Sequence, residues 1–474
     1  MARGGLNLLD IDKGVVVAPA GCGKTQLIAD ALRQHTSEKP ILVLTHTNSG
    51  VAALRGRLQR AGVNPASYRV ATIDACAIRL ISMFPERAGH DPGIINAARP
   101  NYRAIRDATC NLLKAGHIND VLAASYARLL VDEYQDCSTR QHSMVCYASA
   151  ALPTCVVGDP IQAIFGFGDD PLPDWDQDVC KYFPLTGELS RPWRWINAGA
   201  EELGDWLLSV RRQLLCGEPI DLTKAPIVVT WIKLNGDQKD HVRRLQAGRV
   251  NPPDNVGSVL IIGESTSPAS QQRFASEIPG AVTVEAVDLR DLVTFARNLD
   301  MTSASALLTI GEFAESIITN VGAADLVRRV DIIERGHEHR KPSAVELAAL
   351  AFRKAPCPQN FLTLLVEINK QPGVRVFRPA VLRACLRALE LCNGPEQDSF
   401  ADAAIKVREQ GRVLGRPLPR RAVGSTLLLK GLEAEVSVIL DADSLTSRNL
   451  YVAMTRGSKR LVICGRRSIL NPAW

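Results

Sequence analysis

The sequence predicts an α/β protein with two lobes, each built on a parallel sheet. Short apolar runs alternate with helical patterns over the first 190 residues, at 15–17, 41–44, 68–72, 129–132 and 155–158. Runs of this kind are typical of strands that are buried on both faces of a parallel sheet. Similar runs return at 227–231, 259–263, 436–440 and 461–464, so a second sheet is expected.

Composition places the chain among ordinary globular proteins. Of its 474 residues, 46% are hydrophobic and 22% are charged, which excludes a wholly disordered or fibrous chain. The net charge of +6 is too small to indicate nucleic-acid binding by itself. No apolar run approaches the roughly 20 residues of a membrane span, and no signal peptide is visible, so we expect a cytoplasmic protein with no membrane partner. The 12 cysteines form no Cys-x-x-Cys pair, which favours reduced thiols over a metal site.

Four parts follow one another along the chain. We expect the first lobe at residues 1–85 and 126–190, interrupted by a small helical insertion at 86–125. The second lobe is expected at 191–300 and 411–474. Residues 301–410, with Ala/Leu/Arg-rich patterns at 344–353 and 381–392, should form its helical insertion.

A glycine-rich segment between the first strand and the first helix predicts a phosphate-binding loop. It reads Ala-Pro-Ala-Gly-Cys-Gly-Lys-Thr over residues 18–25. The glycines let backbone N–H groups approach phosphates, Lys24 reaches the β- and γ-phosphates, and Thr25 offers a hydroxyl to Mg²⁺. The alternative is a glycine-rich turn with a coincidental Lys-Thr, but strand, loop and helix come in the order that phosphate binding needs. The predicted nucleotide-binding residues are Ala20, Gly21, Cys22, Gly23, Lys24 and Thr25.

A carboxylate pair ends the fourth apolar run, in the sequence Leu-Leu-Val-Asp-Glu-Tyr-Gln-Asp over residues 129–136. At the carboxyl end of a strand, Asp132 can hold Mg²⁺ and Glu133 can polarise the attacking water. An exposed acidic loop is the alternative for the pair alone. The flanking Gln135 and Asp136, about a hundred residues after the phosphate loop, favour the catalytic interpretation.

Further motifs follow along the chain in the order of a known family, and with them the chain resembles the superfamily 1 DNA helicases of the UvrD/Rep/PcrA type. Residues 44–48 resemble the family's Thr-Phe-Thr-Asn motif, and 71–74 its Thr-x-His-Ser motif. Residues 156–167 resemble the third motif, and 192–194 the Asn-Tyr-Arg motif. Residues 430–433 and 450–456 resemble the fifth and sixth motifs. The resemblance therefore covers about 1–200 and 420–474, and the middle of the chain matches by position only.

This resemblance implies two RecA-like P-loop lobes and a Mg²⁺-dependent ATPase that binds single-stranded or partly duplex DNA. It also implies 3′→5′ translocation or unwinding. Gln162, Arg194 and Arg456 would contact the γ-phosphate, and Gly431 and Glu433 would lie on the nucleotide. The implied DNA contacts are Thr45, His46, Asn48, Thr72, Phe165, Phe167 and Lys430.

Several positions depart from the family pattern. Asp10 stands where the family has an adenine-reading Gln, His46 where it has a base-stacking Phe, and Asp74 where it has a His. We expect Asp74 to repel phosphate. The insertions are also smaller than the subdomains that grip duplex DNA in the family, which leaves strong unwinding open.

These departures keep an alternative function open. In it the chain is a nucleotide- or DNA-sensing ATPase subunit with little unwinding of its own. The smallest UvrD-like proteins that it resembles include the helicase-like subunit of Gabija-type antiviral (anti-phage) systems, whose partner is an OLD-like nuclease with a TOPRIM site. A catalytically dead module is disfavoured because Lys24, Glu133, Gln162, Arg194 and Arg456 are all present. No acidic cluster indicates a nuclease in this chain.

Overall fold

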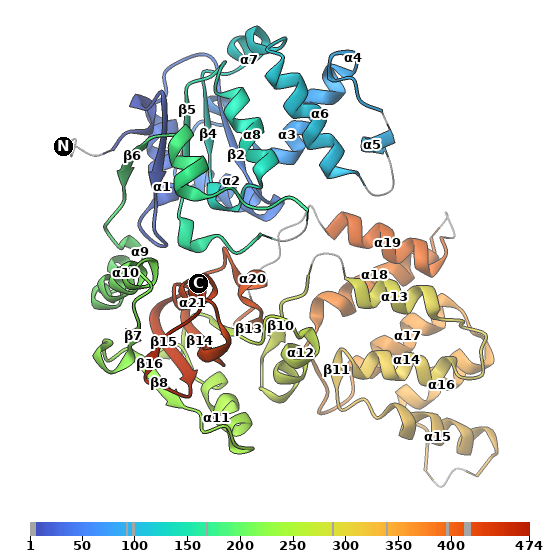
Figure 1. The fold of residues 1–474 in the computed structure, drawn as a ribbon. Helices are drawn as coiled ribbons and strands as arrows, with labels where there is room; N and C mark the ends of the chain where they lie inside the picture. Colours follow the sequence, from blue (N-terminus) through green and yellow to red (C-terminus); the bar gives the residue numbers. More distant parts are fainter. Residues whose placement is uncertain are drawn as a thin grey trace. The chain divides into compact units, whose positions relative to one another are not determined.

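The computed structural model describes residues 6–91, 93–96, 100–166, 169–286, 289–337, 340–394, 398–411 and 419–474 (Figure 1). The chain divides into two compact units. The first consists of Met1–Trp231, Ala442–Leu461 and Arg467–Trp474, and the second of Ile232–Asp441 and Val462–Arg466. Each unit is built around its own hydrophobic core.

The first unit contains a six-stranded sheet in the order β3-β2-β4-β5-β1-β6, and all its pairings are parallel. Successive residues of β1 face opposite cores: Val15 packs in one and Val16 in the other. Every residue of the central strands β2, β4 and β5 is buried, as the apolar runs predicted. The strands are β1 (Lys13–Val17), β2 (Ile41–Thr45), β3 (Tyr68–Thr72), β4 (Arg128–Val131), β5 (Thr154–Gly158) and β6 (Leu185–Glu188).

Helices follow these strands, and local signals mark where they begin. Thr47 caps α2 by accepting the amide hydrogen of Gly50, and Ser138 and Gln141 form a capping box at the start of α8. The described residues between 85 and 125 form four helices, of which α6 packs against α3 and α8. The helices are α1 (Lys24–Gln34), α2 (Asn48–Arg60), α3 (Ile73–Met83), α4 (Pro85–Ala88), α5 (Gly93–Asn96), α6 (Tyr102–Lys114), α7 (Asn119–Ser125), α8 (Thr139–Ala148), α9 (Trp193–Asn197), α10 (Glu201–Leu215) and α21 (Ser447–Met454).

A second six-stranded sheet has the order β10-β13-β9-β14-β15-β8, and the pairings of β9 with β13 and β14 are parallel. Val259 and Ile261 of β9 pack with Phe274 of α12 (Pro268–Glu277) in the core of the second unit. Two six-stranded sheets with many helices confirm the predicted fold class. The strands are β8 (Val229–Lys233), β9 (Val259–Ile262), β10 (Val282–Thr283), β13 (Arg421–Gly424), β14 (Ala434–Ile439) and β15 (Gly457–Gly465).

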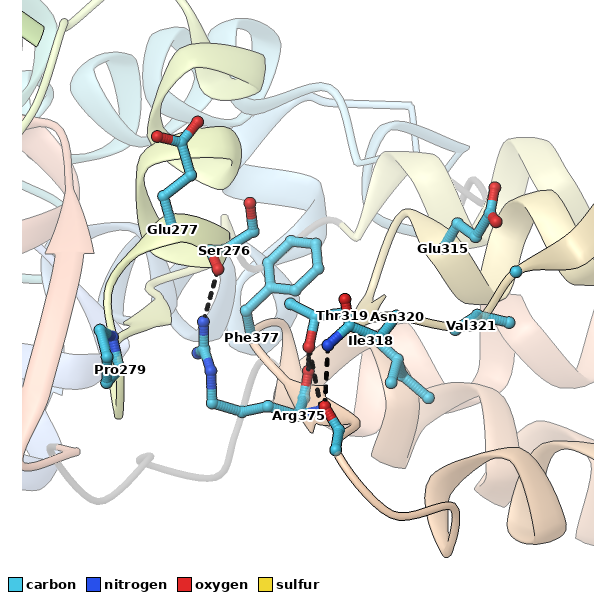
Figure 2. A pocket seen from close by; sticks show the side chains of 12 residues that line it. Ser276, Glu277, Pro279, Glu315, Ile318, Thr319, Asn320, Val321, Arg375 and Phe377 are labelled. Carbon is cyan, nitrogen blue, oxygen red and sulfur yellow. Dashed lines mark hydrogen bonds between the residues drawn. The ribbon is translucent and has the colours of Figure 1, made fainter.

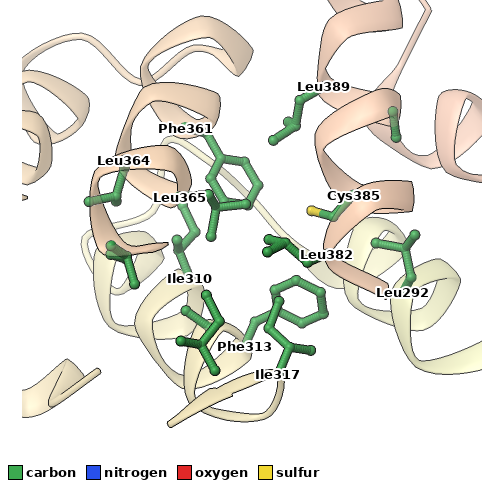
Figure 3. Packing of buried hydrophobic residues seen from close by; sticks show 14 of the residues in the cluster. Leu292, Ile310, Phe313, Ile317, Phe361, Leu364, Leu365, Leu382, Cys385 and Leu389 are labelled. Carbon is green, nitrogen blue, oxygen red and sulfur yellow. The ribbon is translucent and has the colours of Figure 1, made fainter. Parts of the chain in front are cut away.

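Helices between β10 and β13 enclose a separate core (Figure 3). Phe313, Phe361 and Leu382 meet at its centre, and the rings of Phe295 and Phe313 stack at 3.8 Å between centroids. Each fully buried Leu, Ile or Phe contributes about 1.5–3 kcal/mol through burial, so this core stabilises the helices. The short strands β11 (Ile318–Thr319) and β12 (Arg375–Val376) add Ile318 and Val376 to it. The helices are α13 (Arg290–Asn298), α14 (Ala306–Glu315), α15 (Ala323–Glu334), α16 (Ala344–Lys354), α17 (Pro358–Asn369), α18 (Pro379–Cys392) and α19 (Phe400–Gly411).

Further helices and short strands complete the two units. None of the helices in the described ranges has the length and hydropathy that a bilayer crossing would need. The remaining helices and strands are α11 (Lys239–Gly248), α12 (Pro268–Glu277), α20 (Thr426–Leu429), β7 (Ile220–Asp221), β11 (Ile318–Thr319), β12 (Arg375–Val376) and β16 (Ile469–Leu470).

A cavity of about 660 Å³ lies in the second unit, beside β11, β12 and the end of α12 (Figure 2). At its wall, the Arg375 guanidinium donates to the carbonyl oxygens of Ala275, Ser276 and Ala281. The last carbonyls of a helix have no partner within the helix, so Arg375 supplies the donors that the end of α12 lacks. None of the residues in the predicted site lines this cavity.

Candidate functional site

The predicted phosphate loop joins β1 to α1, as the sequence indicated. Gly21 and Gly23 have φ angles of +71° and +92°, a region that strains other residues. A Cβ on Gly21 would also lie 2.5 Å from Cζ3 of Trp195, so the loop needs glycine there for space as well. Ala20 and Cys22 are buried in the loop, and burial raises the pKa of the Cys22 thiol to about 12. Cys22 therefore stays a protonated packing group at neutral pH.

The loop meets the acidic strand end. Lys24 Nζ lies 3.0 Å from Asp132 Oδ1 and also donates to Glu133 Oε1. Burial alone would lower the pKa of the Lys24 ammonium, but the two carboxylates raise it above its usual range. Burial raises the pKa of the Asp132 carboxyl, and the charge of Lys24 opposes that effect. Two motifs about a hundred residues apart are thus joined through Lys24.

Glu133 has a φ angle of +54°, in the left-handed region. A non-glycine residue there costs about 1–3 kcal/mol and persists only where its surroundings hold it. Glu133 is held at three points. Its backbone N–H donates to Asp132 Oδ1 at 2.9 Å, Gln135 Nε2 donates to its Oε2 at 2.5 Å, and Lys24 binds its other oxygen. Such backbone strain is common where a side chain has a chemical task.

The donor set for a metal ion fits Mg²⁺. The Thr25 hydroxyl and the Asp132 carboxylate are hard oxygen ligands, the kind that Mg²⁺ prefers beside substrate phosphates. In this structure Arg57 Nη1 of α2 donates to Thr25 Oγ1 at 2.9 Å. Sequence reasoning missed this contact, because nothing in the chain connects a residue of α2 with the start of α1.

Gln162, the predicted γ-phosphate sensor, lies in a short 3₁₀ turn at Pro160–Gln162, just after β5. Its side chain is 9% exposed, and its Nε2 donates to Asp159 Oδ2 at 2.9 Å. The Oδ1 atom of Asp159 accepts two hydrogen bonds from Arg211 of α10. Sequence reasoning missed Arg211, although one signal was available. Arg211 falls on the same helical face as Leu203, Leu207 and Leu214, which are buried.

Arg194 and Arg456, the two predicted γ-phosphate arginines, both contact the end of α21. Arg194 Nη1 donates to the Thr455 carbonyl at 2.6 Å, and its backbone N–H donates to the Gly21 carbonyl at 3.0 Å. Arg456 is 4% exposed and donates from Nε to the Val452 carbonyl at 2.8 Å. We expected both arginines in the second lobe. Both segments belong to the compact unit that holds the phosphate loop, and the lobe boundaries themselves stay a prediction.

Trp193 is a neighbour of the phosphate loop that the sequence did not single out as such. Its side chain is 37% exposed, and its Cδ1 lies 3.1 Å from where a Cβ on Gly23 would be. The Arg191 guanidinium lies 4.1 Å from the indole centroid. Trp195, by contrast, is buried and donates from Nε1 to the Gly457 carbonyl at 2.9 Å. One indole of this pair is therefore available to a ligand, and the other is a packing group.

Several of the predicted DNA contacts lie where β2 and β3 end. Thr45 and Thr72 are the last residues of these neighbouring parallel strands, so they lie at the same edge of the sheet. Thr45 is 1% exposed, and Thr72 Oγ1 caps α3 by accepting the Ala75 N–H at 3.0 Å. Asn48 begins α2. Thr72 therefore caps a helix, and the DNA contacts of Thr45 and Thr72 stay predictions.

The rings of His46 and Phe165 are brought together, with centroids 5.3 Å apart and planes tilted by 53°. Phe167 lies outside the described residues. Lys430, Gly431 and Glu433 belong to the second unit, between α20 and β14, and Gly431 has a φ angle of +83°. The predicted roles of these residues stay predictions.

Asp74 is part of an ion-pair network in the first unit. Arg106 of α6 binds it with two hydrogen bonds, from Nε at 2.8 Å and Nη2 at 2.7 Å, and Gln141 Nε2 adds a third at 3.0 Å. Arg106 also donates to Asp170, which accepts the Ser138 hydroxyl at 2.6 Å. The expectation that Asp74 repels phosphate did not take account of Arg106, whose positive charge neutralises this carboxylate.

The comparison with known families agrees with this geometry. The family model for the UvrD/REP helicase N-terminal domain matches residues 10–108 and 98–169, the stretch that carries the phosphate loop, the acidic motif and the third motif. No curated protein matches the chain. Proteins with this domain are in general helicases that act on DNA and use ATP with a divalent metal. The match over residues 10–169 supports a UvrD/Rep-like superfamily 1 helicase.

Proposed function

We propose that this protein is a Mg²⁺-dependent ATPase that binds single-stranded DNA and couples hydrolysis to translocation or unwinding. The resemblance implies a 3′→5′ direction. The observation that carries the proposal is the contact of Lys24 with Asp132 and Glu133 at the carboxyl end of a parallel sheet. A phosphate-binding lysine, a metal-binding carboxylate and a water-activating carboxylate meet there in the arrangement that phosphoryl transfer needs.

Each residue of this cluster has a chemical task in the proposal. Lys24 and the N–H groups of residues 20–25 bind the β- and γ-phosphates. Thr25 and Asp132 hold Mg²⁺, which neutralises phosphate charge when bound. Glu133 accepts a proton from the attacking water. The remaining tasks, which the resemblance implies, are contact with the γ-phosphate by Gln162, Arg194 and Arg456, and contact with the nucleotide by Gly431 and Glu433.

Single-stranded DNA would cross the ends of β2 and β3. The paired rings of His46 and Phe165 offer faces on which bases can stack, and base stacking on an aromatic ring contributes about 1–3 kcal/mol per base. The further proposed contacts are Thr45, Asn48, Thr72, Phe167 and Lys430.

A second candidate function rests on the Asp74 network. Where the family has a histidine, this chain has a carboxylate that is bound by Arg106. The described residues of 85–125 supply helices of 4 to 13 residues, smaller than the subdomain that the resemblance leads us to expect there. A subunit that senses nucleotide or DNA and controls a partner nuclease, such as an OLD-like TOPRIM enzyme, needs ATP chemistry but little grip on duplex DNA.

The deciding experiment is ATP hydrolysis by the purified chain, with and without single-stranded oligothymidylate. Stimulation by about tenfold or more supports a DNA-coupled motor, and a strand-displacement assay on a 3′-tailed duplex then tests direction. A rate of ATP hydrolysis that DNA does not change favours the regulatory subunit. A chain that neither binds nor hydrolyses ATP would contradict both candidates, because both need the phosphate site.

A further inference from the structure

Arg211 is a buried charge that belongs to none of the motifs. It lies in the last turn but one of α10, and its side chain is 7% exposed. A buried guanidinium is costly unless its N–H groups are all bound, so its partners indicate what it does. Its main partner is Asp159, which is itself 1% exposed and directly precedes the turn that carries Gln162.

The hydrogen bonds divide the two oxygens of Asp159 between two residues. Arg211 donates from Nε at 3.0 Å and from Nη2 at 2.9 Å, and both bonds reach Oδ1. Oδ2 is left to accept the Gln162 amide at 2.9 Å. The third nitrogen of Arg211, Nη1, donates to Glu188 Oε1 on β6 at 2.8 Å. The guanidinium therefore fixes which oxygen of Asp159 faces Gln162.

The backbone of Asp159 connects the same residue to the water-activating carboxylate. Its N–H donates to Gln135 Oε1 at 3.1 Å, and Gln135 Nε2 donates to Glu133 Oε2 at 2.5 Å. A Cβ on Gly158 would lie 2.7 Å from Gln135 Oε1, so the glycine makes room for this connection. Asp159 is thus bound to Gln162 by its side chain and to Glu133 through Gln135.

We propose that Arg211 is a positioning residue of the ATP site, which acts through Asp159 to fix the carboxamide of Gln162. This inference rests on the proposed ATPase function. An ionised Asp159 can only accept hydrogen bonds, so Gln162 must present its NH₂ group to it and turn Oε1 the other way. The side chain that is expected to contact the γ-phosphate is then held in one of its two amide orientations.

Loss of Arg211 would remove this preference for one orientation of the Gln162 amide. Burial raises the pKa of the Asp159 carboxyl, and Arg211 opposes the rise more strongly than Gln162 and Lys24 do. Without the guanidinium, the carboxyl gains a proton more readily and can then donate to Oε1 of Gln162. The carboxamide could take either orientation, and a misplaced catalytic group costs up to about 10² in rate.

The test compares Arg211→Met with Arg212→Met, the same change at the exposed neighbouring position. We expect kcat for ATP to fall by about tenfold or more in Arg211→Met, while KM changes by less than about threefold. Arg211→Lys should restore part of kcat, because one ammonium can still bind Oδ1. Glu188→Gln, which removes the negative charge of the other partner of Arg211, should leave kcat within about twofold. Equal rates in Arg211→Met and Arg212→Met, or an equal loss in Glu188→Gln, would overturn the proposal.

A thermal-unfolding cycle tests the same coupling without turnover. Arg211→Met, Gln162→Ala and the double variant are compared with the unchanged chain by the midpoint of unfolding. We expect the second substitution to lower the midpoint clearly less in the presence of the first, since both act on Asp159. Additive shifts would contradict the proposal even if the chain hydrolyses no ATP. If Arg211→Met does not fold, Arg211→Lys takes its place in the cycle, and Arg211→Met with Asp159→Asn should fold because no unpaired buried charge remains.

Discussion

Two groups of motif residues lie at the same edge of the first sheet, and they differ in how they are built. At the ends of β1, β4 and β5, Lys24 contacts Glu133, and Gln162 is connected to Glu133 through Asp159 and Gln135. Each of the three has a functional group that phosphate chemistry needs. At the ends of β2 and β3, Asp74 stands in place of a phosphate-binding side chain and is bound by Arg106. The first group keeps the pattern of the family, and the second departs from it.

The difference has a physical reason. Phosphoryl transfer requires donors and carboxylates at fixed positions around a single phosphorus atom, and one missing group costs about 10²–10³ in rate. A DNA strand offers many phosphates and bases, and its affinity is a sum of many contacts that can be replaced singly. A sheet edge that serves both ligands can therefore change on the DNA side while the ATP side stays as it is.

The largest effect is expected from Lys24→Ala. The substitution removes the ammonium that contacts Asp132 and Glu133 and that is expected to bind the β- and γ-phosphates. Hydrolysis should fall by about 10³ or more. The measurement is steady-state phosphate release, with Lys181→Ala as a control because Lys181 is an exposed lysine of the same unit. Normal turnover in Lys24→Ala would remove the phosphate loop from the mechanism.

Glu133→Gln separates chemistry from binding at the same place. The amide keeps the size of the side chain but cannot accept a proton from water, so turnover should fall by about 10² or more. Binding of a fluorescent ATP analogue should stay within about threefold, since Lys24 and Thr25 are unchanged. Glu86→Gln, at an exposed position of α4, is the matched control. An unchanged rate in Glu133→Gln would mean that another group activates the water.

The ATP side could be predicted from the sequence to a large extent. Residues 18–25 and 129–136 are contiguous motifs, and each contains the strand end that positions its side chains. The contact between Lys24 and Glu133 then follows from a parallel sheet, because the strand ends meet at one edge. The strand runs likewise predicted a fold that the two sheets confirm.

The parts that could not be predicted depend on pairs from distant segments. Nothing in the sequence connects Asp74 with Arg106 or Asp159 with Arg211, because each pair joins separate elements and an Asp and an Arg are compatible with many partners. The grouping of residues 442–461 with the first unit is also set by tertiary contacts, such as the bond from Arg194 to Thr455. These contacts decide details of the site that the motifs leave open.

Arg106→Met tests the DNA side of the comparison. The variant leaves Asp74 and Asp170 without their shared guanidinium, and the free energy of unfolding should fall by about 1–3 kcal/mol. The value is below that for a fully buried pair, because these side chains are 14–20% exposed. Urea unfolding measures it, and Arg103→Met, whose side chain is 62% exposed, should change stability by less than about 0.5 kcal/mol.

Arg106→Met should also affect DNA binding without affecting ATP hydrolysis in the absence of DNA. Asp170 follows the segment that carries Phe165, so a displaced Asp170 should weaken DNA binding. The concentration of oligothymidylate that gives half-maximal stimulation of hydrolysis should rise, while hydrolysis without DNA stays within about twofold. A loss of DNA-free hydrolysis as large as that of Glu133→Gln would show that the two sides of the sheet edge are one cooperative structure.

The smallest expected effect is a difference in acid sensitivity between the two sides. On the ATP side, the Tyr134 hydroxyl of the acidic motif lies 2.8 Å from His142 Nδ1. Burial lowers the pKa of His142, and Asp178 opposes that effect. On the DNA side, burial would raise the pKa of Asp170, but hydrogen bonds from Ser138 and the Arg140 backbone and the nearby Arg106 lower it overall.

The signs of these shifts predict an order of loss on acidification. As the pH falls below about 6.5, the unfolded chain protonates His142 while the folded chain resists, so the free energy of unfolding decreases. The stability that Asp170 contributes begins to be lost only when the pH falls below about 3.9, the ordinary pKa of an aspartate. This loss continues as the pH approaches the lower pKa of Asp170 in the folded chain. Urea unfolding between pH 7.5 and 5.5 should therefore show a decline that His142→Gln reduces and that Asp170→Asn leaves in place. The exposed His117→Gln is the control, and a decline unchanged by His142→Gln would assign the acid-sensitive group to another part of the chain.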